Sequence, residues 1–335
     1  MSSGSVLRIG VPDLISPSYF PVVAAVDLGF FDAEGLPAEV RLVPPVDRTL
    51  EQLRDGALDL VGGSAHSVCR VFPRWAGANL LAALSQNTYW LLVVRSDLGA
   101  VRGDLSCLRG LRIGAAPLVD LSLRRLLVQA GLDEARDGIE IGPVPGAFLG
   151  SDLNFGVAAA RALEAGLIDG FWANGMGAEV SVRSGAGTVL LDARRGDGPP
   201  GSEHHTFPAL IATETFVGER GDEVAAAVRA LTRAQQTLRD DPGAATRVGA
   251  QRFPAYEATL IADLVARDAP FYDAAISRST VDSLTTFQRD VGLLDVPVGY
   301  ADVVASSGQQ PGPDRSGRDG TAPTARTSAG AAPST

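Results

Sequence analysis

The stretch that decides the fold runs from Leu7-Arg-Ile-Gly-Val-Pro12 to Gly62-Gly-Ser-Ala-His66. It predicts three short apolar strands, at residues 7–11, 39–43 and ending near 63. Each strand ends in small, polar or proline residues, and a helix start follows. In an open α/β sheet the ligand site lies there, because loop and helix N-terminal amides gather beyond the carboxyl ends of parallel strands. The stretch therefore predicts a binding cleft and not a reactive group.

The second part of the chain repeats this pattern. A strand at residues 111–115 leads through a loop of small residues into a helix and then a strand at 139–141. Arg161–Trp172 repeats the order of Leu50–Val61: a helix that ends at a glycine, an aspartate and a short apolar strand. Acidic residues at 222 and 223 start a long helix with one apolar face. The repeat predicts an α/β fold of two similar lobes, with mixed, mostly parallel sheets and a ligand cleft between them.

The chain is expected to cross between the lobes twice, since a strand within residues 205–213 is predicted to return to the first lobe. Lobe 1 then comprises residues 1–92 and 206–305, and lobe 2 comprises 93–205. Residues 306–335 are mainly Ser, Gly, Pro, Ala and Thr. Such a segment has too little apolar surface to offset the entropy of ordering, so disorder is expected there.

The composition excludes several classes of function. A net charge of −10 argues against nucleic acids and anionic membranes as partners. The sequence has no run that could span a membrane and no export signal at its start, which indicates a cytoplasmic protein, or a periplasmic or cell-surface one if the true start lies upstream. Cys69 and Cys107 fit no metal-binding spacing, and we expect neither metal nor cofactor. All 29 basic residues are arginine, so no lysine is present to form a Schiff base.

Four motifs carry a resemblance to a known family. In order they are Gly29-Phe-Phe-x-x-Glu-Gly-Leu36, Leu53-x-x-Gly-Ala-Leu-Asp-Leu-x-Gly-Gly-Ser64, Leu105-x-x-Leu-Arg-Gly-Leu-Arg-Ile-Gly114 and Ala165-Gly-Leu-Ile-Asp-Gly-Phe171. The chain resembles the substrate-binding proteins of ABC transporters of the sulfonate/taurine/nitrate and thiamine-precursor type, from residue 6 to about 304. The resemblance implies a type II periplasmic-binding-protein fold, a monomer that closes on a small molecule and delivers it to an ABC permease.

Two enzyme groups of similar fold offer a check on catalysis. Thiamine pyrimidine synthases of the yeast type hold pyridoxal phosphate on a lysine, and this chain has no lysine. Sulfinate desulfinases carry a cysteine in the first strand-to-helix loop and an arginine just before the paired glycines. Here that loop is Ser16-Pro-Ser-Tyr-Phe20, and Asp59-Leu-Val61 precedes Gly62. The key residues of both enzyme groups are therefore missing.

Candidate ligand-binding residues follow the predicted strand ends. Those of the first lobe and of the link to the second are Ser16, Ser18, Tyr19, Phe20, Ser64, His66, Gln86, Asn87 and Tyr89; those of the second lobe and of the return are Pro117, Trp172, Asn174 and His205. Hydroxyl and amide groups would hold a polar head, and aromatic rings would lie against the ligand body. Several have a structural alternative: helix capping for the serines, core packing for Phe20 and Trp172, and hydrogen bonding within the protein or at its surface for His66, Gln86, Asn87 and Tyr89.

No loop concentrates arginine as an anion clamp would, so the lining favours a small heterocyclic or aromatic ligand, or a sulfonate-like anion held by helix ends. The leading hypothesis is solute binding by lobe closure, as part of an ABC-type importer. The alternative is a cytosolic lyase or hydrolase that uses His66, His204 or His205 as its acid or base.

Overall fold

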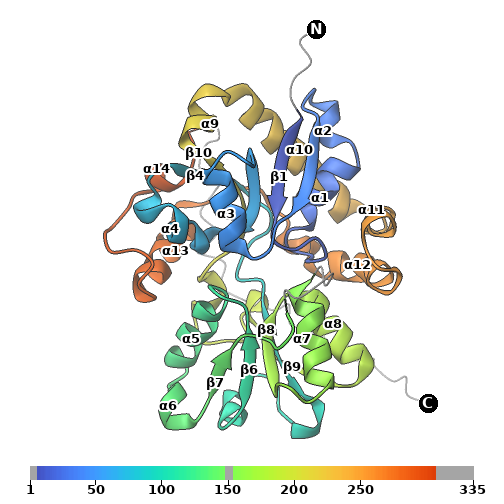
Figure 1. Cartoon of the computed structure of the whole chain (residues 1–335), viewed down its shortest axis with the longest axis vertical. Coiled ribbons are helices and arrows are strands. Elements are labelled where there is room, and N and C mark those ends of the chain that lie inside the picture. Colours follow the sequence, from blue (N-terminus) through green and yellow to red (C-terminus); the bar gives the residue numbers. More distant parts are fainter. Residues whose placement is uncertain (1–5, 148–153, 307–335) are drawn as a thin grey trace, which may run out of the picture.

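The computed structural model describes residues 6–147 and 154–306, which form two lobes arranged end to end along the long axis of the molecule (Figure 1). The predicted disorder of the tail lies outside the described residues, except for Ser306. Within those residues, no helix is both long enough and apolar enough to cross a membrane.

The first lobe is built on a five-stranded sheet in the order β2-β1-β3-β10-β4. Its strands are β1 Leu7–Val11, β2 Ala38–Leu42, β3 Leu60–Ser64, β4 Ala78–Ala83 and β10 Pro208–Thr213. Strands β1, β2 and β3 are parallel, whereas β10 runs antiparallel to both of its neighbours. The three predicted strands of the opening stretch therefore pair with one another, and their carboxyl ends lie on one edge of this sheet.

The second lobe repeats the same arrangement in the order β7-β6-β8-β5-β9. Its strands are β5 Leu91–Arg95, β6 Arg112–Ala115, β7 Glu140–Gly142, β8 Gly170–Ala173 and β9 Gly187–Asp192. Again three strands are parallel and a fourth, β5, is antiparallel to its neighbours. Each sheet thus takes its antiparallel strand from the segment that has just crossed from the other lobe.

The two crossings run through residues 84–90, from β4 to β5, and residues 193–207, from β9 to β10. Strand β5 lies entirely in the second sheet, although residues 91 and 92 were assigned to lobe 1 from the sequence. Strand β10 returns to the first sheet, as its sequence suggested. We keep the lobe boundaries as a proposal, with the first crossing placed before residue 91.

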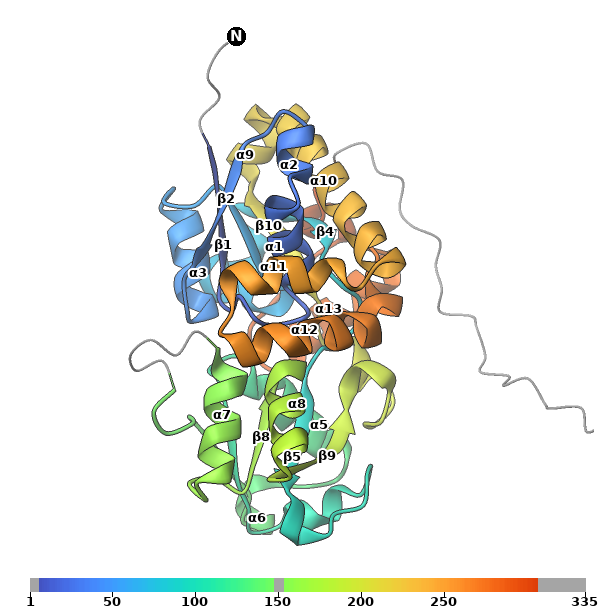
Figure 2. The same ribbon diagram turned by 90° about the vertical axis from the view of Figure 1, so that its right-hand side faces the viewer.

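Helices cover both sheets and approach each other where the lobes meet. In the first lobe they are α1 Phe20–Asp27, α2 Phe30–Ala33, α3 Val46–Arg54, α4 Val68–Val71, α9 Glu214–Glu219, α10 Gly221–Asp240, α11 Ala244–Arg252, α12 Ala255–Asp268, α13 Arg278–Asp290 and α14 Tyr300–Val303. In the second they are α5 Asp120–Gln129, α6 Glu134–Asp137, α7 Phe155–Glu164 and α8 Gly175–Ser184. Figure 2 shows α12 of the first lobe directly above α8 of the second.

The internal repeat predicted from the sequence extends to single side chains. The same sequence, Leu-Arg-Ile-Gly, occurs at residues 7–10 in β1 and at residues 111–114, where Leu111 directly precedes β6. In the first lobe, Asp59 accepts hydrogen bonds from the backbone N–H and the guanidinium of Arg8. In the second, Asp169 does the same for Arg112. In both lobes, therefore, the aspartate that precedes β3 or β8 holds the start of the neighbouring strand, β1 or β6, by hydrogen bonds.

The long helix α10 follows its sequence prediction closely. Asp222 and Glu223 lie in its first turn, where carboxylates oppose the helix dipole favourably. Val224, Leu231 and Leu238 are fully buried on the predicted face. Strand β4 and helix α8 were not predicted, because Ala78-Asn-Leu-Leu-Ala-Ala83 shows no alternation and α8 begins with two glycines among its first three residues.

Gly177 of α8 and Gly156 of α7 allow these two helices to pack backbone to backbone. A Cβ atom at Gly177 would lie 2.6 Å from the carbonyl carbon of Gly156, closer than such atoms approach. Gly177→Ala is expected to lower the free energy of unfolding by about 3 kcal/mol, because the clash involves backbone that cannot rotate away. Chemical denaturation measures this. The control is Gly218→Ala in α9, where the space around the glycine is open. It should raise the free energy of unfolding by no more than about 1 kcal/mol. Equal effects of the two substitutions would contradict the close approach.

Candidate ligand-binding cleft

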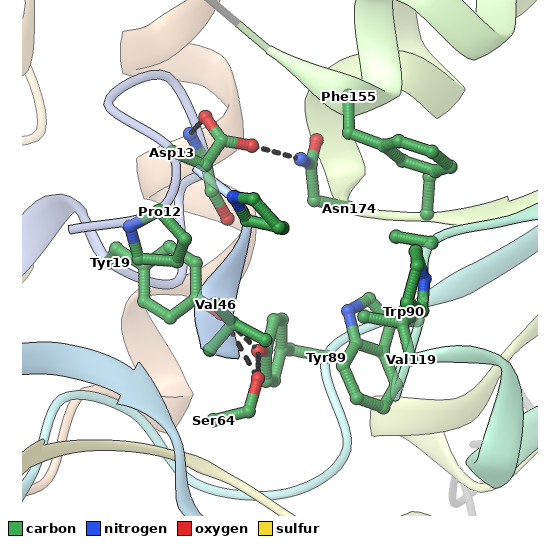
Figure 3. Close-up of a pocket in the computed structure, with 15 residues that line it drawn as sticks. Pro12, Asp13, Tyr19, Val46, Ser64, Tyr89, Trp90, Val119, Phe155 and Asn174 are labelled. Atoms are coloured by element: carbon green, nitrogen blue, oxygen red, sulfur yellow. Dashed lines mark hydrogen bonds between the residues drawn. The ribbon is translucent and has the colours of Figure 1, made fainter. Parts of the chain in front are cut away.

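A cavity lies between the two lobes, with about 540 Å³ of empty space including its open mouth. It is lined by Pro12, Asp13, Ser16, Tyr19, Pro45, Val46, Ser64, Tyr89, Trp90, Ala116, Pro117, Val119, Phe155, Ala173 and Asn174 (Figure 3). These residues follow the carboxyl ends of β1, β2 and β3 in one lobe and of β6 and β8 in the other, or begin α7, or belong to the first crossing. The cavity therefore occupies the edge that parallel sheets use for ligands.

Three hydroxyl groups meet on one wall of the cavity. The Tyr89 hydroxyl lies 2.5 Å from that of Tyr19 and 2.5 Å from Ser64 Oγ, and Tyr19 lies 3.1 Å from Ser64. Burial raises the pKa of Tyr19 to about 12, so this cluster stays protonated at neutral pH. A triangle of hydroxyls can both donate to and accept from a polar group of a ligand.

Aromatic rings form a second element of the lining. Tyr89 and Trp90 belong to the first crossing, with ring centroids 4.6 Å apart, and Phe155 is the first residue of α7. Figure 3 shows Trp90 and Phe155 on the same side of the cavity. Flat apolar surfaces with a few placed polar groups are typical of pockets for small organic molecules.

Asp13 is one of the polar groups that link the two lobes, and it does so at the cavity. Its Oδ1 accepts from the backbone N–H groups of Ile15 and Ser16, 2.9 and 3.1 Å away. Asn154 Nδ2 lies 2.6 and 2.7 Å from the two carboxylate oxygens, and Asn174 Nδ2 lies 2.7 Å from Oδ2 (Figure 3 shows Asn174). Burial raises the pKa of Asp13 to about 6, although these hydrogen bonds oppose the shift.

Six of the residues singled out in the sequence come together around this cavity: Ser16, Tyr19, Ser64, Tyr89, Pro117 and Asn174. Asn174 is the N-cap of α8, and its Oδ1 accepts from the N–H groups of Met176 and Gly177. Contact of these six side chains with a ligand stays a prediction.

Seven others lie outside the lining. Ser18 Oγ accepts a hydrogen bond from Arg194, and Phe20 is fully buried against Phe253. The Gln86 and Asn87 side chains bond to backbone carbonyls. Trp172 is also fully buried, with its ring 6.0 Å from that of Trp90. The remaining two are histidines.

His66 and His205 are buried hydrogen-bonding residues away from the cavity wall. His66 bonds to Thr206 Oγ1 and, across the lobes, to the carbonyl of Leu118. His205 lies between Ser122 and Gln129 and stacks on Phe287. Burial lowers the pKa of each to about 4, so both are neutral at pH 7. His204, whose side chain is 52% exposed, does not line the cavity either.

Several lining residues were not among the candidates from the sequence: Pro12, Asp13, Pro45, Val46, Trp90, Ala116, Val119, Phe155 and Ala173. Asp13 had the clearest signal, since it follows the first strand directly. Trp90 directly precedes the apolar strand β5, so its sequence context indicates burial in the core and not a cavity wall. Val46 and Phe155 are each the first residue of a helix at the cavity. An apolar residue gives no sequence signal for that position.

An arginine cluster forms in the second crossing, where the sequence suggested no concentration of arginine. Arg194 is 3% exposed and pairs with Asp268 of α12 at 2.9 Å. It also donates to Ser18 and Ser85, and Arg195 reaches Asp268 as well. Through these ion pairs and hydrogen bonds, Arg194 and Arg195 hold the second crossing against the first lobe. Both arginines lie outside the cavity lining.

Solved structures of known proteins share this architecture. The chain superimposes on the alkanesulfonate-binding protein SsuA of Xanthomonas axonopodis pv. citri, bound to MOPS, with a TM-score of 0.67 and 17% identity over 91% of this chain and 98% of that one. The periplasmic nitrate-binding protein NrtA of Synechocystis PCC 6803 gives a TM-score of 0.69 and 14% identity over 87% and 83%. The desulfurization enzyme DSZB gives 0.58 and 18% over 87% and 94%.

These similarities show the fold: two lobes of the periplasmic-binding-protein type, as the sequence predicted. At such identities they show the fold alone, and it is shared by binding proteins and an enzyme. No protein-family model matches the chain, and no curated protein sequence matches it.

Proposed function

We propose that the protein binds one small molecule between its lobes and serves as the substrate-binding component of an ABC-type importer. The observation that carries this proposal is the cavity itself, lined from both lobes and from the first of the two crossings that join them. Two connecting segments allow the lobes to open and close as rigid bodies, and a ligand that touches both lobes stabilises the closed state.

The lining supports a small, flat, heterocyclic or aromatic ligand. Tyr19, Tyr89, Trp90 and Phe155 offer ring surfaces, and the hydroxyl cluster offers hydrogen bonds. A sulfonate-like ligand, the other class that the sequence left open, would use the same hydroxyls. The importer role places the protein in the periplasm or at the cell surface, where a monomer would present the closed lobes to an ABC permease.

The geometry does not favour the enzyme alternative. A general acid or base must reach the reacting atom, and none of the three histidines lines the cavity. Two of them are neutral and already bonded to protein groups.

Filling the cavity tests the proposal. Molecules retained by the purified protein are identified by mass spectrometry, and their affinity is measured by calorimetry. Val119→Trp, at the cavity wall beside the N-terminus of α5, is expected to weaken binding at least tenfold because the indole occupies the ligand's volume. The control is Val128→Trp on the same helix, whose side chain is 62% exposed and which should leave affinity unchanged.

A molecule recovered unchanged, at one per chain, supports the binding function. Conversion of that molecule into a product by the protein would instead support the enzyme. Binding that is indifferent to Val119→Trp would contradict this location of the site. Light scattering should give the mass of a single chain, 34.7 kDa, for a monomer.

A further inference from the structure

The charge of the cavity carries a conclusion about the ligand. Asp13 is the one ionisable carboxylate among the lining residues, and within the described chain the lining contains no arginine, lysine or histidine. Within the described residues, five hydrogen bonds reach Asp13, and all come from neutral donors, namely two backbone N–H groups and two asparagine amides. Among residues 6–147 and 154–306, no ion pair involves this carboxylate. Its negative charge is therefore solvated by dipoles but not neutralised.

The helix ends that a bound anion would use in lobe 2 are already occupied. Asn154 caps α7 by accepting from the N–H of Val157, and Asn174 caps α8 by accepting from Met176 and Gly177. Both amides then donate to Asp13. The protein's own carboxylate thus binds the two asparagine amides that cap these helix N-termini.

Two other helices that begin at the cavity carry a carboxylate in their first turn. The first turn of α3 contains Asp47, and that of α5 contains Asp120. At the start of α1, the N–H groups of Tyr19 and Phe20 are bonded to the carbonyl of Ser16. A sulfonate or nitrate in this cavity would meet a buried like charge without a compensating cation.

A cation meets the opposite conditions. Its charge would be attracted to Asp13, and the faces of Tyr89, Trp90 and Phe155 can interact with a cationic nitrogen through their π systems. The raised pKa of Asp13, about 6, leaves it mainly ionised at neutral pH, and a bound cation would stabilise the ionised form further.

We propose that Asp13 determines the specificity of the cleft: it excludes anions and selects a small aromatic ligand that carries a positively charged nitrogen. This inference rests on the proposed solute-binding function and narrows its ligand class. Asp13 then has two roles: it accepts hydrogen bonds from lobe 2, and it provides the negative charge that pairs with the ligand.

Three probes of one shape and different charge test the inference. Benzylamine, benzyl alcohol and phenylmethanesulfonate share a ring and differ in the charge of the head group. With the full chain at pH 7.5, ligand-observed NMR titration should show benzylamine binding at least tenfold more tightly than phenylmethanesulfonate, with benzyl alcohol between them. Tightest binding of phenylmethanesulfonate, or of nitrate added as a fourth probe, would overturn the inference.

The variant Asp13→Asn removes the charge and keeps the shape. It should reduce the ratio between benzylamine and phenylmethanesulfonate to within about threefold, because the charge preference and not the general affinity is lost. A merely structural role would weaken all probes alike and leave the ratio unchanged, which would contradict a specificity role. Glu164→Gln, an equal charge change at the far end of α7, should leave the wild-type ratio intact.

If Asp13→Asn fails to fold, the order of the three probe affinities for the wild-type protein still tests the inference. An anionic molecule recovered from the purified protein would overturn the specificity while the solute-binding function stands. Absence of binding by every probe, together with absence of any retained molecule, would contradict the solute-binding function itself.

Discussion

Asp268→Asn is expected to destabilise the protein by about 3–5 kcal/mol, because it leaves a buried arginine without its countercharge. The carboxylate of Asp268 is 4% exposed and pairs with Arg194, which burial alone would disfavour as a cation. Arg195 and Arg267 also lie within 3.3 Å of Asp268. Removing one negative charge therefore leaves three guanidinium groups close together.

The control for this prediction lies on the same helix. Asp263 pairs with Arg183 at 3.0 Å, but its side chain is 70% exposed, and Asp263→Asn should cost less than about 1 kcal/mol. Urea denaturation at pH 7 measures both. Adding Arg194→Met to Asp268→Asn should recover part of the loss, since the uncompensated charge is removed. Equal costs at positions 263 and 268 would show that the buried pair does not stabilise the crossing.

Acidification from pH 7 to pH 4.5 is expected to lower the free energy of unfolding by about 3 kcal/mol. This value is the net effect of three buried groups, because His66 and His205 lower the stability and Asp13 raises it. His66 and His205 have pKa values lowered from 6.5 to about 4, so the unfolded chain binds protons first as pH falls. The folded state is not penalised by these histidines above pH 6.5. As pH falls from 6.5 towards 4, each histidine lowers the free energy of unfolding by about 3 kcal/mol.

Asp13 contributes with the opposite sign. Its pKa is raised from 3.8 to about 6, so the folded state takes up the proton first and gains stability as pH falls from 6 to 4. Asp13→Asn should therefore steepen the loss to about 5 kcal/mol, and His66→Gln should reduce it. Denaturation curves at pH 7, 5.5 and 4.5 provide the measurement. A variant Asp13→Asn whose stability is constant over this range would contradict the neutral, buried histidines.

Much of the fold could be predicted because its signals are local. The alternation of strands and helices, the glycine ends of helices and the aspartates at positions 59 and 169 all lie within short segments. The repeat of Leu-Arg-Ile-Gly at β1 and β6 marks equivalent strands, and both sheets have the predicted repeat architecture. Strand β4 was missed, since a uniformly buried strand has no period that distinguishes it from a helix segment.

The site was predictable at the level of strand ends and less so for single side chains. Ser16, Tyr19, Ser64, Tyr89, Pro117 and Asn174 follow or flank the expected edges and line the cavity. Whether a neighbouring side chain faces the cavity or the core depends on helix phase. Ser18 and Phe20, adjacent to Tyr19, therefore point to Arg194 and to the core.

The sequence by itself determined that this protein has two similar α/β lobes and a cleft at the carboxyl ends of their strands. The tertiary structure decided the charge of that cleft. Asp13 meets Asn154 and Asn174 across 141 and 161 positions of chain, and Arg194 meets Ser18 across 176. Such pairings arise only when the two crossings bring the lobes together, because no local pattern encodes which distant groups share a buried space.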